Sequence, residues 1–312
     1  MNVAAPCRWT MQDVDRFQEM QVFQAVAEKG GFAAAARRLN LSAASATRAV
    51  AALEARIGTT LFLRGTRQTR LTEAGERYLN DCRRILTELD DADASAAGSR
   101  AVPRGPLAVT APALFGELYV TPLIGEYLTT NPEVNVHAML LDRVVSMHDE
   151  GFDVGVRIGE LPDSSLHAVQ VGHVRRVVCA APSLLALHGA PVHPSALTAL
   201  PIVMASNVSL TFDWRFHDGA SVFAVRIHPR FAVNVNQAAI VAAVQGLGFT
   251  RLLSYQIAAQ LSAGALQLVL EHFEPAPLPV HVVYREGRRA SAKIRSFVDF
   301  CVARLRANPT LN

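Results

Sequence analysis

The stretch that most constrains this chain is residues 31–75, GFAAAARRLNLSAASATRAVAALEARIGTTLFLRGTRQTRLTEAG. Two helical patterns flank a short break at Asn40-Leu41, and Ser42 stands where a helix N-cap belongs. Between positions 37 and 70 the stretch holds seven arginines and one acid, Glu54. A compact helical module whose charge has one sign suits a polyanion, so we expect this stretch to bind DNA.

The spacing of apolar residues in this stretch predicts a helix-turn-helix followed by a wing. Residues 32–39 form a short helix, and Asn40 tolerates the left-handed conformation that a tight turn needs. A third helix runs from its cap at Ser42 to residue 57, where Gly58 ends it. Its inward face is predicted to hold Ala46, Val50, Leu53 and Ile57. The segment LFLRGTRQTRL that follows is typical of a two-stranded wing.

A recognition helix contacts base edges with its N-terminal residues, whereas basic residues of a wing contact phosphates. The candidate DNA-binding residues are therefore Ser42, Ala43, Ser45, Thr47 and Arg48 on the helix and Arg64, Arg67 and Arg70 on the wing. The alternative is a solvated basic loop on a small helical domain.

One long helix is predicted from Thr72 to about Ala97. Its apolar seam consists of Tyr78, Cys82, Ile85, Leu89, Ala92 and Ala96. Such a stripe must be buried, either against a second subunit or inside the same chain. We favour dimerisation, because helix-turn-helix proteins commonly recognise two half-sites with two recognition helices. The predicted domains are a DNA-binding domain (11–70), a linker helix (71–98), a hinge (99–106) and a C-terminal domain (107–306).

Beyond the hinge, strands and helices alternate, which predicts an α/β domain with a mostly parallel sheet. Ligands of such sheets bind beyond the carboxyl ends of the strands. The candidate ligand-binding residues at strand ends are Thr110, Ala111, Pro112, Ala113, Leu141, Arg157, Asn207 and Asn236. The Arg157 guanidinium suits a carboxylate, but an ion pair with Asp142, Asp153 or Glu160 explains it equally well.

Composition excludes several other classes of protein. The net charge is only +3, so nucleic-acid binding is a property of one segment and not of the whole chain. The four cysteines are widely spaced without a CxxC pair, and no run of about 18 apolar residues exists. We therefore expect a cytoplasmic protein with free thiols and no metal. The chain carries no GxSxG, HExxH or P-loop motif, so we expect no catalytic residues, no cofactor and no enzymatic activity.

The first quarter of the chain resembles the LysR-type transcriptional regulators. The resemblance rests on AAARRL, Ser42, Leu53-Glu54, Ile57-Gly58, LF-x-R at 61–64 and LTEAG at 71–75. The chain departs from the family pattern at Ala43-Ala44, where a glutamine with a neighbouring proline or serine is usual. This departure removes a contact to base edges, so the DNA sequence that is preferred stays open.

The resemblance implies a winged helix-turn-helix, a linker helix that pairs two subunits, and a two-lobed α/β effector-binding domain like a periplasmic binding protein. Lobe I would comprise about 107–178 and 280–306, and lobe II about 179–279. The implied partners are an interrupted palindrome in promoter DNA and a small effector, often a carboxylate. The resemblance also implies self-association as a dimer or tetramer, and RNA polymerase is a further candidate partner.

The leading hypothesis is thus a DNA-binding transcriptional regulator controlled by a small molecule held between two lobes. The alternative is a cytosolic solute-binding or enzyme-like α/β domain that carries a helical oligomerisation arm. A third hypothesis is a constitutive DNA-binding protein whose C-terminal half only oligomerises.

Overall fold

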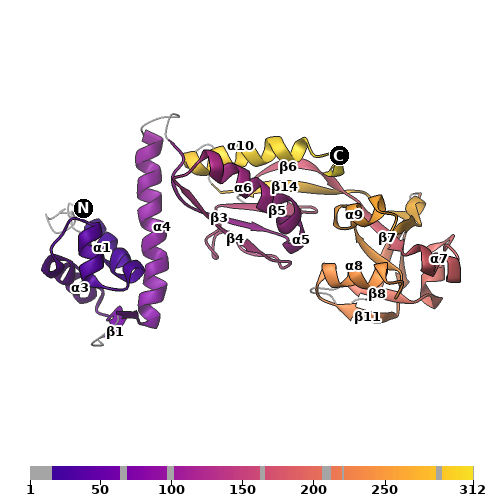
Figure 1. Ribbon diagram of the computed structural model, residues 1–312, viewed down its shortest axis with the longest axis horizontal. Coiled ribbons are helices and arrows are strands. Elements are labelled where there is room, and N and C mark those ends of the chain that lie inside the picture. The colour runs from indigo at the N-terminus through magenta and orange to yellow at the C-terminus, as the bar shows by residue number, and fades with distance from the viewer. Residues whose placement is uncertain are drawn as a thin grey trace, which may run out of the picture. The chain divides into compact units, whose positions relative to one another are not determined.

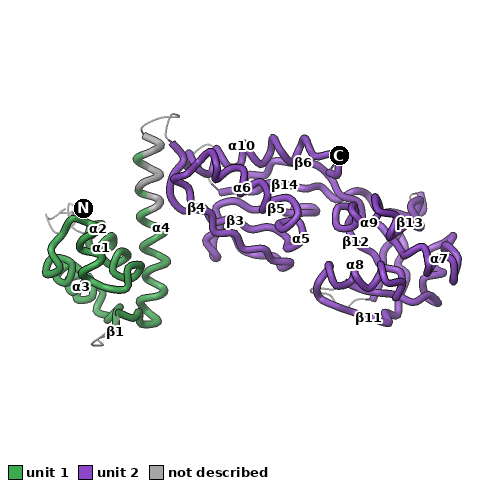
Figure 2. Tube along the Cα trace, viewed as in Figure 1, with its two compact units in different colours: residues 1–99 green, residues 100–312 purple. Residues whose placement is uncertain are grey.

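The computed structural model describes residues 16–63, 69–96, 102–161, 166–205, 212–219, 221–285 and 290–311. The chain divides into two compact units, residues 1–99 and 100–312, which Figure 2 shows in different colours. Each unit has a hydrophobic core of its own. Within the described ranges, no helix is both long enough and apolar enough to cross a membrane.

The first unit consists of helices and a two-stranded wing. Its elements are α1 (Arg16–Lys29), α2 (Phe32–Arg38), α3 (Ala43–Ile57), β1 (Phe62–Leu63), β2 (Arg70–Leu71) and α4 (Glu73–Ala96) (Figure 1). Asn40 has a φ of 54° between α2 and α3, and Gly58 has a φ of 74° after α3. Asparagine and glycine tolerate this left-handed geometry best, so the turn and the helix end predicted at these positions are confirmed.

The core of the first unit lies between α1, α2, α3 and the start of α4. Ala46, Val50 and Leu53 of α3 are buried in it, as predicted. Ile57 was expected to face the same core, but this prediction is wrong, since its side chain is 37% exposed. Ile57 is the last residue of α3, where left-handed Gly58 turns the chain away from the helix axis.

The wing is fastened to the helices by two polar side chains. One carboxylate oxygen of Glu54 accepts hydrogen bonds from the amides of Leu61 (2.6 Å) and Phe62 (3.1 Å). The Thr72 hydroxyl donates to the carbonyl of Thr60 and accepts from the amide of Gly75, both at 2.9 Å. The acid inside the basic stretch therefore has a structural role, because it orients the first strand of the wing.

Part of the apolar seam predicted on α4 packs inside the first unit. Tyr78, Cys82 and Ile85 belong to the core of the first unit, where α4 packs against α1. For these three residues, packing against α1 of the same chain, the alternative considered from the sequence, is therefore observed. The side chains of Ala92 and Ala96 lie outside the described part of the chain.

The second unit comprises two lobes. The elements of lobe I are β3 (Gly105–Ala111), α5 (Ala113–Phe115), the π-helix η2 (Gly116–Val120), α6 (Thr121–Thr130), β4 (Val134–Leu140), β5 (Val154–Ile158), β6 (His167–Val174), β14 (Leu278–Tyr284), α10 (Ala292–Arg306) and η7 (Pro309–Leu311). The five strands form one sheet in the order β4-β3-β5-β14-β6. Strand β3 is parallel to β4 and β5, whereas β14 is antiparallel to both β5 and β6. The single reversed strand is the one that returns from lobe II.

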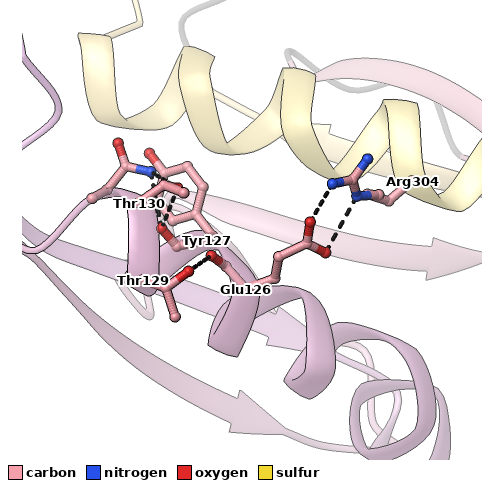
Figure 3. Close-up of polar contacts among 6 residues, drawn as sticks. Glu126, Tyr127, Thr129, Thr130 and Arg304 are labelled. Carbon is pink, nitrogen blue, oxygen red and sulfur yellow. Dashed lines mark hydrogen bonds and ion pairs between the residues drawn. The ribbon is translucent and has the colours of Figure 1, made fainter.

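Helices α6 and α10 cover one face of this sheet (Figure 1). Tyr127 of α6 is buried there, with its ring centroid 5.0 Å from that of Phe297 in α10. Figure 3 shows the polar link at the edge of this contact, where Arg304 of α10 donates two hydrogen bonds to the carboxylate of Glu126 in α6. Apolar packing and one surface ion pair together hold the two helices on the sheet.

Lobe II is built from shorter elements. They are β7 (Arg176–Ala180), α7 (Pro182–His188), η3 (Pro194–Ala199), β8 (Ile202–Ala205), β9 (Asp213–Asp218), β10 (Ser221–Arg226), β11 (Pro229–Val233), α8 (Asn236–Val244), β12 (Thr250–Leu253), η4 (Ser254–Ile257), α9 (Ala258–Ser262), β13 (Gln267–Val269) and η5 (Glu271–Phe273). The described strands form the sheet β12-β7-β13, the parallel pair β11-β8 and the hairpin β9-β10. All pairings within the three-stranded sheet are antiparallel. The prediction of a mostly parallel sheet is therefore wrong for this part of lobe II.

The chain enters lobe II earlier than predicted. Strand β6 ends at Val174 and β7 begins at Arg176, so only Arg175 separates a strand of lobe I from one of lobe II. The boundary between the lobes therefore lies at 175 and not at 178–179, because one extended segment continues from the first sheet into the second. The return lies between η5 and β14, at 274–277.

Candidate DNA-binding surface and effector site

The N-terminus of α3 carries a row of connected polar side chains. The Ser42 hydroxyl accepts a hydrogen bond from the Ser45 amide at 3.0 Å, which is the geometry of an N-cap. The two serine hydroxyls lie 2.8 Å apart, and the Arg48 guanidinium donates to the Ser45 hydroxyl at 3.2 Å. Because the hydrogen bond to Ser45 uses one guanidinium nitrogen, the remaining N–H donors of exposed Arg48 are available to an external acceptor.

Thr47 and Ala43 lie beside this row and are both exposed. The Thr47 hydroxyl donates to the Ala43 carbonyl at 2.9 Å, so its proton is already used inside the helix. Its oxygen can still accept a hydrogen bond. The structure therefore brings the five helix residues singled out in the sequence together at one exposed helix end.

The seven arginines between positions 37 and 70 do not form one uniform basic surface. Arg38 pairs with Glu28 at 2.8 Å and Arg56 with Glu19 at 2.9 Å, so acids of α1 neutralise two of the seven. The remaining described arginines, Arg37, Arg48 and Arg70, are exposed and have no carboxylate within ion-pair distance in the described ranges. The wing residues Arg64 and Arg67 lie outside the described residues.

The candidate effector residues of lobe I lie where β3 ends and α5 begins. Thr110 is 1% exposed, and its hydroxyl oxygen has no hydrogen-bond partner among the described residues. Ala111 is buried and accepts a hydrogen bond from the Leu141 amide at 2.9 Å. Pro112 and Ala113 are half-buried. An unpaired buried hydroxyl is costly, so Thr110 is the polar group here that most needs a partner.

A carboxylate of the chain itself occupies the helix start at Ala113. One oxygen of Asp142 accepts the hydrogen bond of the Ala113 amide at 2.9 Å. Asp142 follows β4, which pairs in parallel with β3 and so brings the two groups together. An effector carboxylate could bind this amide only by displacing Asp142. The sequence indicated Asp142 as a strand-end residue and as an ion-pair partner for Arg157, but not as a partner of the Ala113 amide.

Arg157 stands on β5, half-buried, and donates to the carbonyl of Val145 at 3.0 Å. Among the described residues, no carboxylate lies within ion-pair distance of it, so the three ion pairs considered from the sequence are not observed. Burial lowers the pKa of the Arg157 guanidinium below its usual value. This loss of hydration favours an anionic partner.

The remaining candidates are less closely connected. Leu141 packs into a small apolar cluster with Val145, Met147 and Phe152. Asn236 is the first residue of α8 and is half-buried, and no hydrogen bond in the described part of the chain links it to lobe I. Asn207 lies outside the described residues.

Two residues missed in the sequence join the lobes directly beside Ala113. Leu114 is buried in a cluster formed otherwise by lobe II residues such as Val177 and Ile240. Tyr255 of η4 packs into the core of lobe I, with its ring centroid 5.2 Å from that of Phe115. The sequence around these two residues carries no signal of such a role, because their burial partners are far away in the chain.

Comparison with known proteins agrees with this architecture. Residues 17–76 match the family described as bacterial regulatory helix-turn-helix protein, lysR family. Residues 100–306 match the LysR substrate binding domain. An HTH-type transcriptional regulator of Xanthomonas campestris is 34% identical over 91% of this chain and 84% of its own length. The HTH-type transcriptional regulator DmlR of Escherichia coli is 29% identical over 93% and 94%.

Solved structures share the fold over nearly the whole chain. CrgA, a LysR-type transcriptional regulator from Neisseria meningitidis, has a TM-score of 0.60 at 26% identity and covers 93% of this chain and 99% of its own. The Vibrio cholerae virulence activator AphB has a TM-score of 0.59 at 24% identity, which covers 92% of this chain and 98% of its own. The chain therefore belongs to the LysR family of bacterial transcriptional regulators, with a DNA-binding helix-turn-helix and an effector-binding domain.

Proposed function

We propose that this regulator recognises DNA bases through the N-terminus of α3. The observation that carries this assignment is the connected, exposed row Ser42, Ser45 and Arg48. The row holds the arginine side chain in place before DNA binds, which lowers the entropic cost of a base contact. Ala43 and Thr47 complete the contact surface, and Arg64, Arg67 and Arg70 bind phosphates on the wing.

We expect each recognition helix to distinguish few base pairs, because Arg48 is the only side chain in the proposed contact surface with several free donors. Two copies would therefore bind the two halves of an interrupted palindrome in promoter DNA. We propose a dimer or tetramer joined through the part of α4 beyond Leu86, since Leu86 and apolar residues before it pack within the chain. Contact with RNA polymerase is part of the same proposal.

For the effector-binding domain we propose a small ligand anchored by Arg157 and Thr110. If the ligand carries a carboxylate, that group binds Arg157 and not the Ala113 amide, because Asp142 occupies the latter. The ligand would act on Leu114, which is adjacent to Ala113 and packs into lobe II. A shift of this residue would change the packing between the lobes and so transmit binding to the DNA-binding unit.

The DNA proposal is tested by gel-shift titrations on the chain's own promoter region and on unrelated DNA. Arg48→Ala should reduce the preference for the promoter about 5- to 150-fold, the effect of losing roughly 1–3 kcal/mol of base discrimination. Arg70→Ala should weaken binding to both DNAs equally and lower the salt dependence. Arg226→Ala, an exposed arginine of the second unit, is the matched control. A uniform loss with Arg48→Ala would contradict the proposed base contact.

The effector proposal is tested by a thermal-shift screen of small carboxylates and aromatic acids on the full chain. A ligand of the folded protein raises the melting temperature. Arg157→Gln should abolish the shift, whereas Asp142→Asn should strengthen binding of anions by removing a nearby negative charge. A carboxylate that binds the Arg157→Gln variant as well as the native protein would refute the assignment.

A further inference from the structure

Two arginines of lobe II lie side by side on one face of its three-stranded sheet. Arg176 begins β7, the central strand, and Arg251 lies on the neighbouring strand β12. In the register, Arg251 is opposite Val178 and Arg176 is opposite Leu253. The two arginines are thus diagonal neighbours, roughly 7–8 Å apart by strand geometry, and their side chains leave the same face.

The hairpin β9-β10 supplies an aromatic support for one of them. The guanidinium carbon of Arg251 lies 5.0 Å from the ring centroid of Trp214 and 5.8 Å from that of Phe216. One terminal nitrogen donates to the carbonyl of Arg215 at 3.0 Å. These contacts fix the guanidinium in place. The hydrogen bond uses one of its five N–H donors, which leaves others for a ligand.

The described part of the chain does not neutralise the charges of this pair. Within the described ranges, no carboxylate lies in ion-pair distance of Arg176 or Arg251. The preceding residue, Arg175, does have one, Glu274 at 3.1 Å. Burial, together with the charge of Arg176, lowers the pKa of Arg251 to about 9, and burial lowers that of Arg176 as well. A guanidinium stays protonated at neutral pH, so the chain holds two neighbouring positive charges.

The pair is also open to solvent. The Arg176 residue is exposed, and Arg251 is half-exposed on its aromatic support. A compact dianion could therefore reach both groups, and its oxygens could accept hydrogen bonds from two guanidinium forks at once.

We propose that Arg176 and Arg251 form a second ligand site on lobe II, which binds a phosphate or phosphomonoester group. Phosphate carries about two negative charges at neutral pH and three strong acceptor oxygens. It therefore matches two neighbouring guanidinium groups in both charge and geometry. This site is separate from the effector site around Thr110 and Arg157 and uses none of its residues.

Trp214 provides a direct assay, since the chain has only two tryptophans. In a Trp9→Phe full-length background, all tryptophan emission comes from the ring beneath Arg251. Titration with inorganic phosphate and with glycerol 3-phosphate, at constant ionic strength, should change this emission saturably. Equilibrium dialysis with radiolabelled phosphate should give one bound phosphate per chain, which also detects binding that does not alter fluorescence.

Three variants separate the proposed site from general charge effects. Arg176→Gln should weaken phosphate binding at least tenfold, and Arg251→Lys should weaken it severalfold because lysine keeps the charge but lacks the fork. Arg226→Gln removes an exposed arginine of the same hairpin that makes none of the contacts described above, and should bind normally. No bound phosphate at 10 mM in dialysis would overturn the proposal. An equal loss in the Arg226→Gln variant would overturn it as well.

Discussion

Glu54 should stabilise the first unit through its two hydrogen bonds to the wing. Glu54→Ala removes the acceptor of the Leu61 and Phe62 amides, which lie at 2.6 and 3.1 Å. A hydrogen bond to a charged group contributes about 1.5–3 kcal/mol. The site is only partly buried, so water can replace part of this energy, and we expect a total loss of about 2–4 kcal/mol. Glu54→Gln keeps an acceptor oxygen and should lose only about 1 kcal/mol.

Buried cysteines allow this loss to be measured in the full chain. Cys82 is fully buried in the first unit, while Cys179 and Cys301 are buried in the second. Thiol labelling under native conditions, resolved by peptide mass spectrometry, reports how often each unit opens. For Glu54→Ala, labelling of Cys82 should accelerate about 30- to 1,000-fold, since about 1.4 kcal/mol corresponds to a tenfold change. Labelling of the other two cysteines should not change.

The outcome for the wing also bears on DNA binding. Glu54 is not part of the proposed DNA surface, so its effect on affinity would come through the position of β1. An acceleration of Cys82 labelling below threefold in Glu54→Ala would refute the structural role of the carboxylate. Equal acceleration at Cys179 would show instead that the substitution loosens the whole chain.

Four further substitutions test close packing and buried ionisation. Gly75→Ala should cost about 1–3 kcal/mol, because a Cβ there would lie 2.1 Å from a backbone oxygen, and faster Cys82 labelling would detect it. Gly125→Ala, whose Cβ meets nothing within 4 Å, should instead be neutral or stabilising. Gly172→Ala should destabilise the second unit similarly, since its Cβ would lie 2.3 Å from the backbone oxygen of the C-terminal turn; a lower urea midpoint of Trp214 emission checks this. Burial raises the pKa of Cys179 from 9.0 to about 12, so the stability that this thiol contributes below pH 9 should be lost as the pH rises towards 12. Between pH 8 and pH 10.5, the urea midpoint should therefore fall less for the Cys179→Ala variant than for the native chain.

The local signals in the sequence predicted the first unit well. Asn40, Ser42 and Gly58 each have a property that suits one backbone position, and each occupies that position in the structure. Such residues can be interpreted alone, because the geometry they support involves only their immediate neighbours. The same holds for the exposed row at the start of α3, which a helical repeat brings together.

Contacts between residues that are far apart in the chain could not be predicted from such local signals. Periodicity identified Tyr78 and Cys82 as a buried face of α4, but it could not tell whether the covering helix belongs to the same chain. Asp142 meets the Ala113 amide only because β3 and β4 pair in parallel with a particular register. Arg251 and Trp214 meet across two strands that no sequence pattern connects. Hydrophobic spacing predicts which side is buried and leaves the partner open.

The reversed strand β14 has a consequence for synthesis on the ribosome. It lies between β5 and β6, which do not pair with each other, so the lobe I sheet stays incomplete until β14 has been made. Roughly a hundred residues of lobe II are translated in that interval, which takes about 5–20 s at 5–20 residues per second. During this time β5 and β6 expose unpaired edges. A nascent chain of this regulator can thus complete its first unit early, while lobe I depends on lobe II for its last strand and is most open to misassociation until then.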